Sequence, residues 1–191
     1  MSRKVNRVPY RLDSGNISDL SPEDIKKIIR AADSVVARGG RDLLAKILKG
    51  SREKKLFKLG LDKEPFYGCF RDLTIKQIKE KIDWVILHRY LVIEYDYRLP
   101  LIYYTQKGWK LAKEIVMEEI IGEFDEMLES GTEYYNMRFL MDKNREMIFE
   151  LLDRIKESKS RKYIPLLEAW AKVDYKKVRQ RIWQVIEELR K

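Results

Sequence analysis

Residues 90–105, YLVIEYDYRLPLIYYT, decide the fold, because the period changes here: Leu91, Ile93 and Tyr95 alternate with Val92, Glu94 and Asp96, and Leu99, Leu101 and Tyr103 alternate on the return. In the segments on both sides of it, apolar residues recur at every third or fourth position instead. A period of two predicts strands, and two such runs joined at residues 96–98 predict a β-hairpin. By this alternation Tyr95 shares a face with Leu91, which leaves Tyr97 at the tip of the hairpin.

Helical spacing precedes the hairpin. Ser21, which is followed by a proline and two acids, begins a helix whose apolar stripe ends at residues 39–40. A second helix is predicted over about residues 41–49. Ser51 can cap a third helix. The inward side chains of this third helix are predicted to be Leu56, Phe57 and Leu59.

The next helix begins at a capping box, TIKQ at residues 74–77, and extends to about His88 with Ile75 on its buried face. After the hairpin, Thr105 caps a long amphipathic helix that reaches about Met127. Helices, a two-stranded hairpin and a long final helix, in that order, predict a winged helix.

The chain divides by pattern into three parts. Residues 1–20 are a basic N-terminal arm, residues 21–130 are the predicted winged-helix domain, and residues 131–191 are a helical C-terminal domain. The last part holds three short helical runs, and the final two, separated at Asp174, form an antiparallel pair of the kind used in helical repeats. The predicted fold class is therefore mostly α with a small β-hairpin, a winged helix followed by a HEAT-like helical bundle.

Charge is sorted along the sequence. The formal net charge is +9 and the isoelectric point is near 9.4, which favours a polyanionic partner such as nucleic acid. Residues 1–11 carry bases and no acid, whereas residues 114–133 carry eight acids and no base. A molecule with one phosphate-facing side would need such sorting.

A single cysteine, Cys69, excludes an intramolecular disulfide and fits a reducing cytoplasm. No apolar run approaches the ~18 residues of a membrane span, and the N-terminus has no secretory signal. We therefore expect a cytoplasmic protein.

Three segments carry a resemblance to a known family: residues 43–74, 82–91 and 98–112. Their landmarks are Gly50-Ser51, Asp62-Lys63, Tyr67-Gly68, Arg71-Asp72 and the Thr-Gln-Lys-Gly run at residues 105–108. In this order they resemble the winged-helix domain at the C-terminus of RecQ helicases. The sequence has no phosphate-binding G-x-x-x-x-G-K-[ST] motif and no four-cysteine zinc site. It is therefore similar to the small stand-alone bacterial proteins that keep this domain and add a helical tail.

The resemblance implies double-stranded DNA as the partner and a nucleoid-associated location. It also implies phosphate contacts from helix starts and loops, and a wing residue that packs on a terminal base pair. Helix N-termini suit phosphates because their backbone amides are unpaired and the helix dipole is positive there. Gly50-Ser51 and Thr74 are expected to present two such ends.

The candidate DNA-binding residues are accordingly Lys49, Ser51, Arg52, Lys54, Lys55, Lys63, Tyr67, Arg71, Thr74, Lys76, Tyr97 and Arg98. A candidate second basic surface comprises Arg3, Lys4, Arg7, Arg11, Lys176, Lys177, Arg179 and Arg181. Trp183 lies one residue off the apolar stripe of the last helix, and is interpreted either as a boundary core residue or as part of a nucleic-acid or protein surface.

Catalytic groups are scarce. His88 is the only histidine and Cys69 the only thiol, so a His/Cys metal site cannot be assembled. His88 is predicted to cap its helix, and acid pairs such as Glu118-Glu119 to form a solvated face. We expect no enzymatic activity, no cofactor, no metal and no small-molecule substrate.

Two functions remain open from the sequence. The first is a double-stranded DNA-binding protein whose C-terminal helices extend the contact or recruit a protein partner. The alternative is a protein-interaction adaptor or transcription-regulator-like module in which the basic charge serves only solubility.

Overall fold

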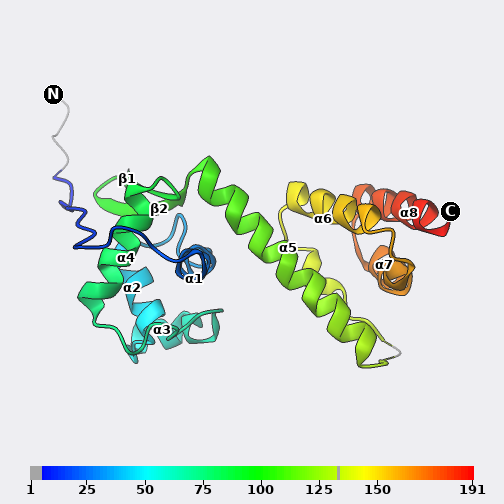
Figure 1. Cartoon of the computed structure of the whole chain (residues 1–191), viewed down its shortest axis with the longest axis horizontal. Helices are drawn as coiled ribbons and strands as arrows, with labels where there is room; N and C mark the ends of the chain where they lie inside the picture. Colours follow the sequence, from blue (N-terminus) through cyan, green and yellow to red (C-terminus); the bar gives the residue numbers. More distant parts are fainter. Residues whose placement is uncertain (1–5, 133) are drawn as a thin grey trace. The chain divides into compact units, whose positions relative to one another are not determined.

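The computed structural model describes residues 6–132 and 134–191 (Figure 1). The chain forms two compact units, Met1–Ile115 and Val116–Lys191. The division lies within one long helix, α5 (Gln106–Glu129), and not at Gly131. The reason is that Ala112 and Ile115 of α5 belong to the core of the first unit, whereas the residues from Val116 onward belong to a second core.

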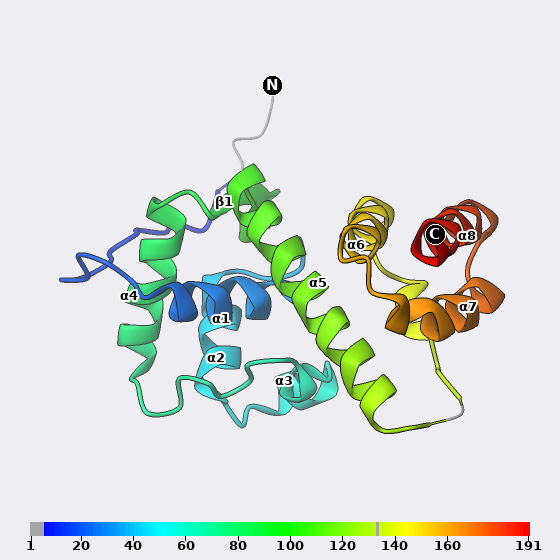
Figure 2. The ribbon, with the colours of Figure 1, turned by 45° about the vertical axis from the view of Figure 1, so that its right-hand side comes forward.

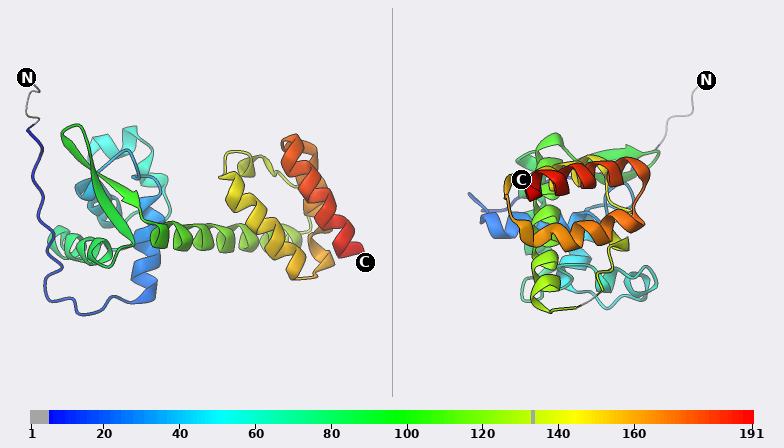
Figure 3. Two further views of the ribbon diagram at one scale, coloured as in Figure 1. Left: turned by 90° about the horizontal axis from the view of Figure 1, so that it is seen from above. Right: turned by 90° about the vertical axis from the view of Figure 1, so that its right-hand side faces the viewer.

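The first unit has the predicted order of a winged helix. Its elements are α1 (Pro22–Ala32), α2 (Arg41–Lys49), α3 (Lys54–Lys58), a 3-10 turn η1 (Leu61–Lys63), α4 (Ile75–Leu87), β1 (Leu91–Asp96), β2 (Leu99–Tyr104) and the first half of α5. The two strands pair as one antiparallel hairpin, visible as neighbouring arrows in Figure 3. A mostly α fold with a small hairpin is thus confirmed.

Helix α1 begins as predicted and ends early. The Ser21 hydroxyl accepts the Asp24 amide at 3.1 Å. The helix stops at Ala32, seven residues before Gly39, because the following segment bonds to the hairpin instead. The Ala37 amide donates to the Ile102 carbonyl and the Ile102 amide donates to the Gly39 carbonyl, both at 3.0 Å. The hairpin therefore gains a third, short partner along β2.

The register of the hairpin fixes its inward face. Leu91 pairs with Tyr104, and Ile93 pairs with Ile102, so these four side chains share the face that meets the core. The pair Asp96–Leu99 closes a two-residue turn at residues 97–98. Hence the tip is as short as a hairpin allows.

The short helix α3 corrects one expectation. Of its predicted inward residues only Leu56 is buried, whereas 48% of Phe57 and 57% of Leu59 are exposed. A helix of five residues makes about one and a half turns, so only one side chain can face the core. Ile75 was also expected inside, but it lies in the first turn of α4 and is 37% exposed.

A buried ion pair joins three segments of the first unit. The carboxylate of Asp83 on α4, which is 2% exposed, accepts two hydrogen bonds from Nη1 of Arg41 on α2, at 2.6 and 2.7 Å. The Asp13 amide donates to the same carboxylate at 2.8 Å, and Arg41 also donates to the Arg11 carbonyl. The N-terminal arm is thereby tied to α2 and α4.

The second unit consists of the second half of α5 and the helices that follow it. These are η2 (Arg138–Leu140), α6 (Arg145–Glu157), η3 (Arg161–Tyr163), α7 (Ile164–Val173) and α8 (Lys176–Arg190). Helix α8 packs against both α6 and α7 (Figure 2). At the corner between α7 and α8, the Trp170 indole donates to Asp174 at 2.6 Å, and Asp174 also accepts the Tyr175 amide. In residues 6–132 and 134–191, no helix is both long and apolar enough to cross a membrane.

We predict that Asp83→Ala lowers the free energy of unfolding by about 3 kcal/mol, because it leaves the Arg41 guanidinium unpaired in a mostly buried site. The measurement is urea denaturation followed by circular dichroism. Asp42→Ala is the matched control, since it removes a carboxylate that is 73% exposed from its pair with Lys79 and should cost less than about 1 kcal/mol. Equal losses in the two variants would contradict the assigned role of Asp83.

Candidate nucleic-acid interface

The Gly50-Ser51 step ends a helix and does not begin one. Gly50 has a φ of +72°, its amide donates to the Ile47 carbonyl, and the Ser51 amide donates to the Lys46 carbonyl. This is a glycine C-cap of α2. Helix α3 begins three residues later at Lys54 and has no side-chain cap. The expectation that Gly50-Ser51 presents a helix start is therefore wrong, whereas the predicted phosphate contact of Ser51 stays a prediction.

The end of α2 is held against the loop of residues 66–72. The amides of Gly68 and Phe70 donate to the carbonyls of Ile47 and Leu48, each at 2.9 Å. Gly50 and Gly68 meet so closely that a Cβ added to Gly50 would lie 2.9 Å from the Gly68 Cα. An added Cβ is therefore excluded by contact at Gly50, whereas Gly68, with a φ of +70°, is favoured as glycine by its left-handed backbone.

Four candidate contact residues take part in the same junction. The Lys49 ammonium donates to the Arg71 carbonyl at 2.5 Å and to the Leu73 carbonyl at 2.7 Å. The Tyr67 hydroxyl donates to the Ser51 carbonyl at 2.8 Å. These polar groups are engaged within the protein, so they position the loop and its exposed neighbours.

The start of α4 has the predicted capping box. Thr74 Oγ1 accepts the Gln77 amide at 3.2 Å, and Gln77 Oε1 accepts the Thr74 amide at 2.9 Å. Lys76 follows with its side chain 86% exposed and only a distant acid, Glu80, at 3.9 Å. Arg71 is exposed just before this helix start and donates from Nε to the Gly68 carbonyl. The helix start thus carries two exposed cations.

A cluster of exposed cations surrounds α3. In the part of the chain that the structure describes, none of its members is paired with an acid. The nearest acid in sequence, Glu53, is already bridged to Lys46 at 2.7 Å. We call this cluster the α3 basic surface; it comprises Arg52, Lys54, Lys55, Lys58 and Lys63. Lys58 was missed by the sequence analysis, and the shortness of α3, which exposes almost every side of the helix, is what brings it in.

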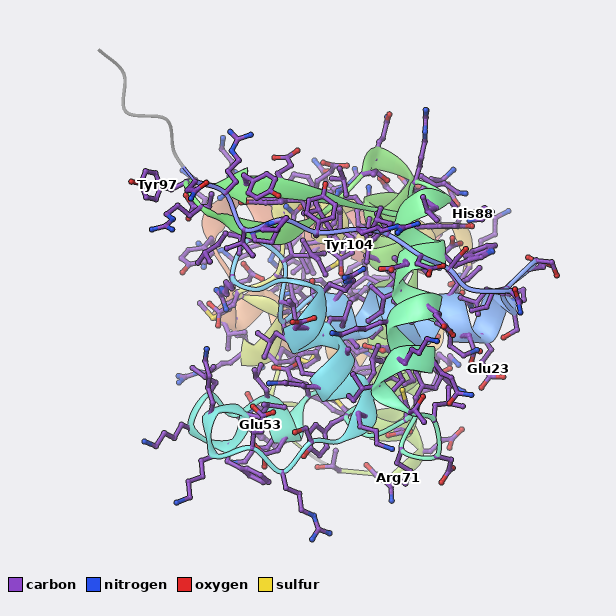
Figure 4. The ribbon with its side chains drawn as sticks, turned by 90° about the vertical axis from the view of Figure 1, so that its left-hand side faces the viewer. Glu23, Glu53, Arg71, His88, Tyr97 and Tyr104 are labelled. Atoms are coloured by element: carbon purple, nitrogen blue, oxygen red, sulfur yellow. The ribbon has the colours of Figure 1, made fainter. Side chains whose placement is uncertain are left out.

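The tip of the hairpin is a separate feature of the first unit. Figure 4 shows Tyr97 projecting beyond the ribbon at the hairpin, while Glu53 and Arg71 lie at the opposite end of that view. Tyr97 is 71% exposed and has a φ of +51°. The candidate contact residues therefore form two groups, one around α3 and α4 and one at the wing.

The N-terminal arm lies along the hairpin and engages Arg98. Arg98 Nε donates to the Asn6 carbonyl at 3.0 Å, and the Arg98 carbonyl accepts the Val8 amide. The Arg7 guanidinium stacks over the Tyr95 ring, 4.8 Å from its centroid. Arg7 is thus placed beside the wing and Arg98 is held by the arm, whereas Arg3 and Lys4 lie outside the described residues.

The basic residues of the C-terminal helix belong to the other unit. Lys176, Lys177 and Arg179 are exposed on α8. Arg181 instead turns toward α6, where it forms an ion pair with Asp153. Of the four predicted basic residues of α8, three are therefore exposed and one forms an ion pair.

The residues with reactive side chains have structural surroundings. His88 ends α4 as predicted, with Nδ1 2.8 Å from the Trp84 carbonyl oxygen and its ring stacked on the Trp84 indole. Burial raises the pKa of the Cys69 thiol to about 11, so the thiol stays protonated at neutral pH. Across residues 6–132 and 134–191, no three His, Cys, Asp or Glu side chains come together as a metal site would require.

The fold and its exposed cations define a winged-helix protein of the nucleic-acid-binding class. The family model of the RQC domain matches residues 19–121, and the chain belongs to that family. The RQC domain is a winged-helix DNA-binding module and is not catalytic on its own. The resemblance read from the landmark residues is confirmed. Comparison with curated proteins and with solved structures gives no match.

We predict that Gly50→Ala lowers the free energy of unfolding by about 3 kcal/mol, because it combines left-handed strain with a clash against Gly68. Gly60→Ala is the matched control: Gly60 has a nearly equal φ of +69°, but an added Cβ would meet no atom within 4 Å. It should cost only the strain, about 1 kcal/mol. Urea denaturation of both variants measures the difference, and identical losses would rule out the close approach as the reason for Gly50.

Proposed function

We propose that this protein binds double-stranded DNA without catalysing a reaction, and that the α3 basic surface carries the binding. The observation that supports this most directly is the set of five exposed cations that have no acidic partner within the described residues. Unpaired cations on a DNA-binding domain are suited to phosphates, because each can neutralise a phosphate and release a counterion. A protein that binds DNA in this way would be located in the cytoplasm, associated with the nucleoid.

The first unit offers this surface in a rigid form. The end of α2 and the loop of residues 66–72 are joined by backbone hydrogen bonds, and Lys49 and Tyr67 add two further links. Binding therefore requires little ordering of the backbone, and the entropic cost falls mainly on the long side chains. Contacts of this type fix position on the duplex and carry no base sequence information.

The wing supports a second element of the proposal, recognition of duplex ends. Tyr97 exposes an aromatic ring at the tip, and a terminal base pair is the place on a duplex where a ring can stack without unstacking other bases. Arg7 lies beside the tip and can add a cation near the last phosphates. In this arrangement the α3 basic surface holds the duplex by its backbone and Tyr97 contacts its end.

One observation favours the alternative function, a protein-interaction adaptor. Phe57 and Leu59 expose large apolar side chains among the cations of α3. Large exposed apolar side chains can contribute to a protein contact. The two functions differ in their response to salt, because binding through apolar side chains changes little where phosphate binding weakens steeply.

We predict steeply salt-dependent binding to a duplex. Five neutralised phosphates correspond to a slope of about −4.5 when log K is plotted against log salt. Fluorescence anisotropy with a labelled duplex at several salt concentrations measures the slope. Lys54→Ala and Lys63→Ala should each reduce its magnitude by about 0.9, whereas Lys110→Ala, an exposed lysine of α5, is the charge-matched control. Binding that does not respond to salt would overturn the proposal and favour the adaptor.

We predict that Tyr97→Ala weakens binding to duplexes with open ends by about fivefold or more, the loss of one base–aromatic stack. On a duplex whose ends are closed by hairpin loops the same variant should bind normally, since only phosphate contacts remain there. Tyr134→Ala, which removes a tyrosine that is 75% exposed elsewhere, serves as the control. The melting temperature should barely change, because Tyr97 buries little surface. An equal loss on open and closed duplexes would exclude end recognition.

A further inference from the structure

We propose that the outer face of α8 binds single-stranded nucleic acid, with Trp183 stacking on a base and Lys176, Lys177 and Arg179 contacting the phosphates. This site belongs to the second unit, outside the residues matched by the RQC domain, and is independent of the duplex-binding function proposed for the first unit. The contacts of α8 with its neighbours, its charge and its exposed aromatic ring support the proposal separately.

The orientation of α8 is fixed by its buried stripe. Val178, Ile182, Val185, Ile186 and Leu189 face the core of the second unit. In Figures 1 and 2, α6 and α7 lie on one side of α8 within this unit. On the rest of the helix, Lys176, Lys177, Arg179 and Trp183 are exposed.

Trp183 lies on this outer face together with cations. It is 43% exposed, and no aromatic ring or cation is stacked on its indole within the described residues. Lys176 and Arg179 precede it by seven and four residues, which places all three side chains along one stripe of the helix. Tyr175, 61% exposed, stands at the N-cap of the same helix. This stripe combines phosphate-binding groups with a free ring.

The first twelve residues from the N-cap of α8, residues 175–186, carry an excess of positive charge that does not stabilise the helix. Residues 175–186 contain four cations and no acid. Among the residues that the structure describes, only Arg181 of these cations has an acidic partner, Asp153. Lys176 and Lys177 lie in the first turn, where a positive charge interacts unfavourably with the helix dipole. A polyanionic ligand accounts for these cations, whereas the stability of the helix does not.

A single strand fits the surface better than a duplex or a protein. The bases of a duplex interior are stacked on their neighbours, so a duplex offers a free base face only at its ends, whereas an unpaired strand offers one at every base. A protein contact would need an apolar patch around the tryptophan, and lysine is depleted at such contacts. The neighbours of Trp183 on the outer face are polar: Lys176, Arg179, Gln180, Gln184 and Glu187.

The test titrates the full chain with labelled 15-nucleotide oligo-dT and oligo-U. Trp183→Ala should weaken binding by about fivefold or more, and Trp183→Phe should restore most of it, because a phenyl ring also stacks. Tyr134→Ala is the control for an exposed aromatic residue of the same unit. Arg179→Gln should weaken binding and reduce the salt slope by about 0.7, whereas Arg145→Gln, which removes an exposed cation from α6, should not. The oligonucleotide that binds more tightly identifies the preferred sugar.

A spectroscopic readout separates stacking from a structural effect. Trp183 is the most exposed tryptophan of the chain, since Trp84 is 5% exposed, Trp170 is fully buried and Trp109 is half-buried. Stacking of a base should quench its emission, and Trp183→Ala should abolish the quenching. Quenching that persists in Trp183→Ala, or oligonucleotide affinity equal to that of the unsubstituted protein, would overturn the proposal.

Further variants distinguish failure of the proposed α8 site from failure of the duplex binding proposed for the first unit. Lys54→Ala combined with Lys63→Ala should weaken duplex binding and leave the quenching of Trp183 by oligo-dT in place. Trp183→Ala should leave binding to a duplex with closed ends unchanged. An equal loss by Trp183→Ala on that duplex and on oligo-dT would mean that the residue only maintains the fold, and would overturn the proposed site.

Discussion

The close approach of Gly50 and Gly68 is the constraint on which the arrangement of α2, α3 and the loop of residues 66–72 depends. It lets the backbone at the end of α2 contact the backbone of the loop of residues 66–72, and two backbone hydrogen bonds form between them. With any larger residue at Gly50, the added Cβ would lie 2.9 Å from the Gly68 Cα, so the backbone at this junction would have to shift. The contact between Gly50 and Gly68 therefore helps to set the positions of the exposed cations on either side of it.

This constraint explains why the landmark residues divide into two roles. Lys49, Tyr67 and the two glycines are engaged with backbone groups, so they hold the loop in place. The residues that can meet a phosphate are the less distinctive lysines and arginines around α3 and the start of α4. The motif therefore identifies the scaffold of the site, and the contact residues follow from their position on it.

The two surfaces proposed here, one in each unit, would bind nucleic acid in different ways. The first unit combines the unpaired cations of the α3 basic surface with an aromatic wing, and the second carries a cation–aromatic stripe on α8. Phosphate contacts are common to both, whereas the rings at Tyr97 and Trp183 differ in what they can stack on. A protein with both surfaces would be suited to nucleic acid that is part duplex and part single strand.

The winged-helix order, the capping box at Thr74, the helix end at His88 and the family were all predictable from the sequence, because they depend on local spacing and on short-range hydrogen bonds. The sequence-based prediction was wrong in placing Phe57 and Leu59 in the core and a helix start at Ser51. The length of α3 depends on the contact between the end of α2 and the loop of residues 66–72, which the sequence does not show. Residues 99–104 are apolar throughout, so only pairing with β1 decided which of them face the core. The capture of Arg98 by the arm joins residues 92 positions apart, and the pairing of Arg181 with Asp153 joins two helices. Such contacts leave no periodic signal in the sequence, and only the tertiary structure could decide them.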